Sequence, residues 1–150
     1  MKNIFIILFI FLLTGCGYTS VYKGINNQDI SIEIKGMTGN EEINDLIDKQ
    51  LQVYKDKKDM RKYQIYVDTT YIKSELTKDT SGKVSSYLLQ LIVNVDVVYD
   101  GKENSFSLEK QINTEPSSDT FKQNIFESNI KRNFVSSIKE DLIFKLSTLQ

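Results

Sequence analysis

The thiol of Cys16 is the side chain whose type and position most clearly predict covalent chemistry. It follows an apolar run over residues 4–13, which is preceded by one basic residue, Lys2, and followed by the small residues Thr14 and Gly15. A basic start, a short apolar run and small residues before a cleavage point are typical of a secretory signal. The run is too short to span a bilayer, which takes about 20 helical residues. The sequence therefore predicts cleavage between Gly15 and Cys16.

The order Leu-Thr-Gly-Cys at residues 13–16 resembles the lipobox of bacterial lipoproteins. In that class the cysteine thiol carries a diacylglycerol, and the amine freed by cleavage takes a further acyl chain, such as palmitate. The resemblance implies the same lipidation of Cys16. Gly17, where other lipoproteins have aspartate, resembles the sorting signal for the outer membrane. We expect a signal peptide over residues 1–15, a lipidated N-terminus and short tether over 16–28, and a single domain over 29–150.

The composition points away from most catalytic chemistry. The chain has one cysteine and no histidine, so it lacks the ligands of a Cys/His zinc site and the usual general base. We expect no catalytic residue, no metal and no cofactor beyond the acyl groups. Removing Lys2 with the signal leaves 18 basic and 20 acidic residues, a net charge of −2, which gives no reason to expect nucleic-acid binding.

The first half of the domain predicts a strand followed by a helix. Residues 29–35 alternate between isoleucine and polar side chains, which is typical of a half-buried strand. Residues 36–40 should end it, and either Thr38 or Asn40 can cap a helix that begins at Glu41. From residue 41 to about 57, one helical face is apolar, with Ile43, Leu46, Ile47, Leu51 and Tyr54.

Three more strands are predicted from period-two patterns. They are centred on residues 63–71, 86–99 and 106–112, and a turn signal at residues 79–82 separates the first two. Asp100-Gly101 predicts a tight hairpin between the last two strands. The chain's one proline, Pro116, should end the last of these three strands.

A helical pattern then runs nearly to Leu149, and two starting points stay open. A core-facing stripe is formed by Phe134, Val135, Ile138, Leu142, Leu146 and Leu149. We favour a start near Ser128, with Phe126 folded under a loop and with Ile130 and Phe144 scattered on the surface, which is ordinary for proteins. A start near Asp119 would instead place Phe126, Ile130 and Phe144 on one outward stripe, which predicts contact with a partner.

These elements predict an α/β (α+β) fold in the order β-α-β-β-β-α. The economical arrangement is a two-layer sandwich, in which both helices pack on one face of a mixed sheet of about four strands. The opposite face would mix polar and apolar side chains: Ser31, Glu33, Gln64, Asp68, Gln90 and Asn94, with Tyr66, Leu88, Ile92 and Val98. Such a face suits docking against another polar protein surface.

Cys16-Gly17-Tyr18, Tyr22 and this element order resemble the lipopolysaccharide-assembly lipoprotein family LptE. The resemblance covers essentially the whole mature chain and contains no catalytic signature. It implies a Gram-negative outer-membrane lipoprotein on the periplasmic face that plugs the β-barrel translocon LptD and assists lipopolysaccharide transport. With Arg61 and Arg132 as its only arginines, the chain departs from many members. No binding residue is therefore transferred from the family.

Lys73, Lys78 and Lys83 surround the predicted turn between the two longest strands. A basic tip there could bind lipid A phosphates. The alternative is the ordinary lysine decoration of an exposed hairpin.

Two other functional classes stay open. The chain could be an auxiliary lipoprotein of another envelope machine, such as a lipid-transport ABC system or a peptidoglycan-synthase activator. It could also be a carboxylate-based hydrolase using Asp68 and Asp96, although no spacing in the sequence recommends this.

Overall fold

The computed structural model describes residues 30–58 and 60–149. Its elements follow the predicted order β-α-β-β-β-α. They are β1 (Ile30–Gly39), α2 (Glu41–Leu51), the short 3-10 helix η2 (Gln52–Tyr54), β2 (Arg61–Lys78), β3 (Val84–Tyr99), β4 (Lys102–Thr114) and α3 (Thr120–Thr148).

The four strands form one mixed sheet in the order β1-β2-β3-β4. β1 is parallel to β2, because α2 carries the chain back to the same end of the sheet, and the other two pairs are antiparallel hairpins. The predicted hairpin at Asp100-Gly101 is confirmed, and both residues have positive φ, 50° and 73°. Two consecutive positive φ values are characteristic of the tight turn that fits the twist of paired strands.

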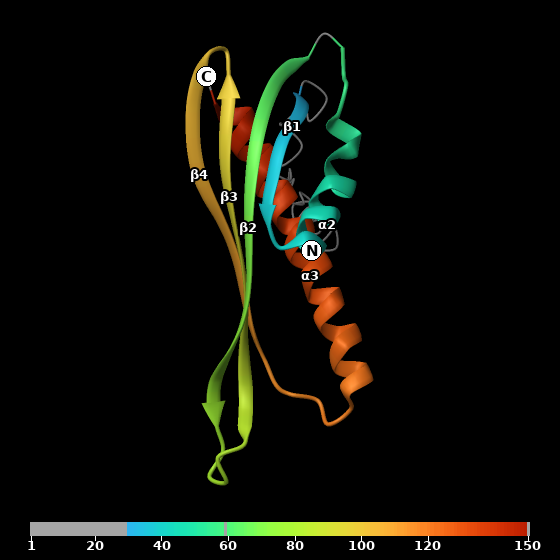
Figure 1. Cartoon of the computed structure of the whole chain (residues 1–150), viewed down its shortest axis with the longest axis vertical. Coiled ribbons are helices and arrows are strands. Elements are labelled where there is room, and N and C mark those ends of the chain that lie inside the picture. Colours follow the sequence, from blue (N-terminus) through green and yellow to red (C-terminus); the bar gives the residue numbers. More distant parts are fainter. Residues whose placement is uncertain (1–29, 59, 150) are drawn as a thin grey trace, which may run out of the picture.

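Both helices pack on the same face of the sheet, which confirms the two-layer sandwich (Figure 1). The alternating residues of β2 and β3 that face the helices are almost completely buried, and so is the apolar stripe of α3. The largest fully buried side chains are Tyr63, Ile30, Ile32, Ile43, Leu51, Ile65, Leu89, Leu91, Ile138 and Leu146. No helix of residues 30–58 and 60–149 covers the opposite face of the sheet, here called the outer face.

Three predicted boundaries were wrong. β1 continues to Gly39, because a register irregularity between Ile34 and Gly36 lets the pairing with β2 resume after the predicted break. The regular part of α2 ends at Leu51 rather than near residue 57. α3 begins at Thr120 and not near Ser128.

The start of α3 is decided by its cap. The Asp119 carboxylate accepts hydrogen bonds from the backbone N–H groups of Phe121 and Lys122, at 2.9 and 3.2 Å. Such a cap satisfies donors that a helix terminus otherwise leaves without partners. Asn40 caps α2 in the same way through the N–H of Ile43, at 3.0 Å, so it prevails over Thr38.

The domain is elongated. β2 and β3 extend past the end of β1 and of α2 to a hairpin tip at the lower end of Figure 1. Since β2 has 18 residues, it spans about 55–60 Å at the rise of an extended strand. Among the described residues, no helix combines the length and apolar character that a membrane span requires.

Candidate docking surfaces

The predicted anchor lies outside the described residues. Cys16, with the predicted cleavage site after Gly15, precedes the first described residue, Ile30. Ile30 is paired with Arg61, at the start of β2, whereas the hairpin tip follows the end of β2 at Lys78. β1 therefore begins at one end of the sheet, and the hairpin tip lies at the other.

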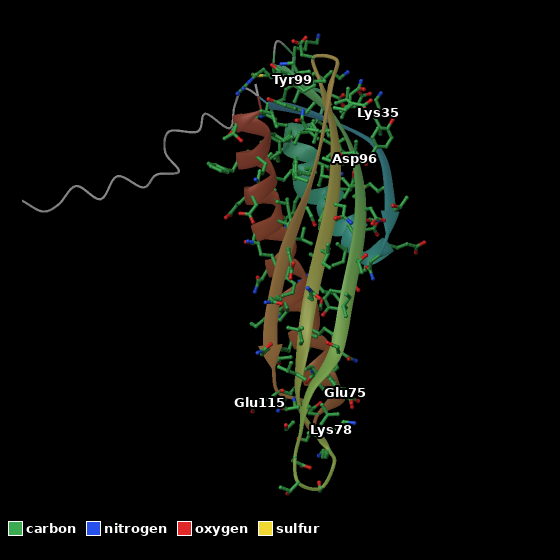
Figure 2. The ribbon with its side chains drawn as sticks, turned by 90° about the vertical axis from the view of Figure 1, so that its left-hand side faces the viewer. Lys35, Glu75, Lys78, Asp96, Tyr99 and Glu115 are labelled. Carbon is green, nitrogen blue, oxygen red and sulfur yellow. The ribbon has the colours of Figure 1, made fainter. Side chains whose placement is uncertain are left out.

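The outer face of the sheet places several predicted residues together. Tyr66 is opposite Asp96, and Asp68 is opposite Asn94, on the neighbouring strands β2 and β3. Thr38 donates to the Asp68 carboxylate at 2.7 Å, and Ser105 donates to that of Asp96 at 2.6 Å. Figure 2 shows Asp96 toward the end of the sheet opposite Glu75, Lys78 and the hairpin tip.

Tyr66 separates two shallow hollows on this face. Its side chain is 49% exposed, although one edge of its ring lies over Gly36. The larger hollow has a volume of about 350 Å³, and the smaller about 160 Å³. Tyr66 and Asp96 line both; the larger adds Val97, Val98, Glu103, Asn104 and Ser105, and the smaller adds Gly36, Thr38, Val67, Asp68 and Asn94.

Both lysines on the β1 side of the outer face share one carboxylate. Glu33 binds Lys35 at 2.7 Å and Lys62 at 3.1 Å. Hydrogen bonds from these two ammonium groups lower the pKa of the Glu33 carboxyl to about 2. Both lysines are therefore held at Glu33, and neither forms an ion pair with the described carboxylates around Tyr66.

The outward stripe predicted on α3 is corrected in part. Phe126 and Phe144 are 42% and 48% exposed, but Ile130 is 9% exposed and belongs to the core. Ile130 lies four residues before Phe134, so it continues the i, i+4 row of the core stripe. Without it, Phe126 and Phe144 are separated by 18 residues, about 27 Å of helix.

No protein-family model and no curated protein matches the sequence. Solved structures do match the fold. Rare lipoprotein B from Shewanella oneidensis is 13% identical with a TM-score of 0.56, and the match covers 75% of this chain and 94% of that one. The chain has the fold of rare lipoprotein B. Lipoprotein B from Nitrosomonas europaea is 12% identical with a TM-score of 0.51, and the match covers 79% of this chain and 87% of that one. A minor lipoprotein from Acinetobacter baumannii is 14% identical with a TM-score of 0.50, and the match covers 77% of this chain and 92% of that one.

In this rare lipoprotein B fold, the three predicted hairpin lysines do not form one basic tip. Lys73 is opposite Leu89, well below the turn, and pairs with Glu127 of α3 at 2.6 Å. Its Nζ also lies 5.1 Å from the centre of the Tyr87 ring. Lys78 pairs with Glu75 at 3.1 Å, and of the three lysines only Lys83 forms no ion pair within the described residues.

Lys73 instead belongs to a cluster of charged and aromatic side chains between the sheet and α3. Tyr71 donates to Glu127 at 3.3 Å, and burial, with the Glu127 carboxylate, raises the pKa of the Tyr71 hydroxyl. Lys131 pairs with Glu42 of α2 at 2.6 Å and lies 4.8 Å from the Tyr71 ring centre. These contacts join β2, α2 and α3 at the end of the core nearer the hairpin between β2 and β3.

An apolar patch at the start of α3 was not predicted. Phe121 is 72% exposed and Ile125 is 47% exposed, and together with Phe126 they form what we call the α3 patch. The signal was present in the sequence, because a helix that starts at Asp119 brings these three residues into its first two turns. A helix that starts near Ser128 leaves all three residues outside it.

Proposed function

We propose that the chain is a lipid-anchored outer-membrane lipoprotein that acts as LptE does. It is held at the periplasmic face through Cys16, plugs the β-barrel LptD and supports both barrel assembly and the delivery of lipopolysaccharide to the outer leaflet. Lipopolysaccharide is the cargo in this proposal. A role without catalysis is part of the proposal.

The observation that carries the proposal is the fold match to rare lipoprotein B. It includes 94% of that protein's chain, so the two share a whole domain rather than a common motif. The domain has the element order on which the resemblance to LptE rests. The lipobox at residues 13–16 adds an independent reason to place this domain at a membrane.

The dimensions of the domain also suit a plug. The tether joins at one end of the sheet, and the hairpin tip lies about 55 Å away along β2. A bilayer with its headgroups is about 40–45 Å thick. A domain anchored at the periplasmic surface and inserted lengthwise into a barrel therefore reaches across the membrane.

The carboxylates of the outer face support a role in binding rather than hydrolysis. Thr38 donates to Asp68 and Ser105 donates to Asp96, so each carboxylate is held by a hydroxyl and has further lone pairs to offer a partner. Within the described residues there is also no group of three side chains able to hold a metal ion.

Co-purification tests the proposal. The full lipoprotein, extracted from membranes in mild detergent, should be recovered with a barrel protein whose gel mobility changes on heating. Recovery of the lipoprotein alone would contradict the proposal. Depletion separates it from the other envelope machines: loss of surface lipopolysaccharide supports it, and intact lipopolysaccharide with an altered cell wall contradicts it.

A further inference from the structure

We propose that the outer face of the sheet, centred on Tyr66, docks against a basic surface of the barrel partner. This inference rests on the proposed function and adds to it the face of the domain that is used and the charge of the surface it meets. It follows from how charge is distributed, from the shape around Tyr66 and from the occupants that the same charge excludes.

In the β3–β4 half of the sheet, charge is segregated between the two faces. In β3 and β4 every acidic side chain within the sheet lies on the outer face. Lys102 and Lys110 of β4 lie opposite Tyr99 and Leu91, on the helix side, where Lys110 pairs with Asp141 of α3 at 2.7 Å. The outer face carries four carboxylates that have no ion pair within the described residues: Asp68, Asp96, Glu103 and Glu109.

The shape around Tyr66 is suited to a cationic side chain. The exposed tyrosine ring has a hollow on each side, and Asp96 borders both. A guanidinium group stacks on an aromatic face and forms paired hydrogen bonds with a carboxylate. The amides of Asn94 and Asn104, which also line the hollows, have no hydrogen-bond partner in the described part of the chain. They supply further donors and acceptors for a polar surface.

The ring of Tyr66 depends on a glycine beneath it. A Cβ atom at Gly36 would lie 3.3 Å from Cδ1 of Tyr66, which is tighter than ordinary van der Waals contact. The register irregularity of β1 lies just before Gly36. This local geometry places the ring over Gly36, between the two hollows, while Tyr66 stays 49% exposed.

Other occupants fit this face poorly. A second copy would bring the same carboxylates against one another, since a two-fold interface uses the same patch on both subunits. Lipid phosphates are repelled by the same charge. The tether over residues 16–28 contains a single basic residue, Lys23, and cannot balance four carboxylates. A basic protein surface is the occupant that the charge favours.

Neutralising the face in the purified complex tests this inference. The variant Asp68→Asn/Asp96→Asn/Glu109→Gln keeps an oxygen that can accept each existing hydrogen bond, so the fold should persist. Exposed ion pairs typically contribute 0.2–1 kcal/mol each, so three lost pairs should weaken retention of the barrel about tenfold. The matched control neutralises exposed carboxylates elsewhere that form no ion pair: Asp45→Asn, Asp100→Asn and Glu115→Gln.

Retention is measured on immobilised lipoprotein as sodium chloride is raised from 0.05 to 0.5 M. We expect the triple variant to release the barrel at lower salt than the wild type and the control, because charge attraction is screened by salt. Equal release curves for the triple variant and the wild type would overturn the inference while leaving the plug function intact.

A second measurement keeps the two proposals distinguishable. If the wild type retains no barrel, the proposed function fails. The face is then tested directly with a fluorescent decalysine peptide and the full lipoprotein in detergent. Binding that is about tenfold weaker for the triple variant, and unchanged for the control, would support a basic partner. No binding to the wild type, or equal binding to both, would overturn it.

Discussion

Among the described glycines, Gly39 is the position at which an added methyl group should lower the stability of the domain most. It is the last residue of β1, has φ +92° and lies opposite Thr69 of β2. A Cβ atom there would lie 1.9 Å from the backbone oxygen of Thr69 and 2.9 Å from its nitrogen. Because these atoms are backbone, the clash cannot be relieved by turning a side chain.

The expected cost follows from the contacts that must separate. The backbone N–H of Asn40 donates to both the carbonyl oxygen and the Oγ1 of Thr69, at 3.1 and 3.0 Å. Disrupting this site costs about 1 kcal/mol per hydrogen bond, and an alanine in the left-handed region costs about 1–2 kcal/mol. Displacing the Asn40 cap of α2 adds about 1 kcal/mol. Gly39→Ala should therefore destabilise the domain by about 4–5 kcal/mol.

Gly82 provides a matched control. Its φ is +82°, and a Cβ atom built on it meets nothing within 4 Å. Gly82→Ala therefore carries the conformational cost without the clash, about 1 kcal/mol. The difference between the two variants isolates the close approach of β1 to β2.

Urea unfolding of the full lipoprotein in mild detergent, followed by circular dichroism, measures both variants. With a slope of about 2 kcal/mol/M, Gly39→Ala should unfold about 1 M earlier than Gly82→Ala or more. Domains of this kind are stable by only about 5–15 kcal/mol, so poor recovery of folded protein is compatible with the same reasoning. Equal midpoints for the two variants would refute it.

Three further predictions concern other contacts. The buried Thr69 hydroxyl lies 2.7 Å from Oδ1 of Asn44. Thr69→Val should therefore lower the free energy of unfolding in urea by about 1–3 kcal/mol. Thr70→Val, on the exposed face, should change that free energy little. The ionised Glu33 carboxylate contributes stability above about pH 4.5 that is lost as the pH falls through about 2; Glu33→Gln should flatten the melting temperature over that interval, and an unchanged acid slope would contradict this. Glu127→Gln should cost about 1–2 kcal/mol, and a double-mutant cycle with Lys73→Met should show coupling near 1 kcal/mol.

The elements of the fold were predictable because their patterns are strongly periodic. The alternation through β3 and the stripe of α3 each specify one buried face, and the Asp100-Gly101 turn specifies the hairpin between β3 and β4. The extension of β1 was not predictable in the same way. Its register irregularity depends on pairing with β2, which is remote in sequence, so residues 36–39 look locally like a turn.

The docking surfaces were predicted less completely. The alternation in β2 placed Tyr66 and Asp68 on the polar face, but the hollows beside Tyr66 arise from three strands together. On α3, a start near Ser128 leaves Phe121 and Ile125 outside the helix. Asp119 was a recognisable cap, and accepting it would have added Phe121 and Ile125. The pairing of Lys73 with Glu127 depends on tertiary contact, so a charge pattern alone could not predict it.

The two exposed surfaces lie on different sides of the domain, and this bears on the partner that we propose. The outer face is acidic and lies on the side of the sheet away from the helices, whereas the α3 patch lies on the helix layer (Figure 1). A partner that touched the domain from one side would leave the other surface exposed to water, including a phenylalanine that is 72% exposed. Large exposed apolar groups mark contact surfaces more often than solvated ones. A partner that surrounds the domain contacts both surfaces, and a barrel lumen has that geometry.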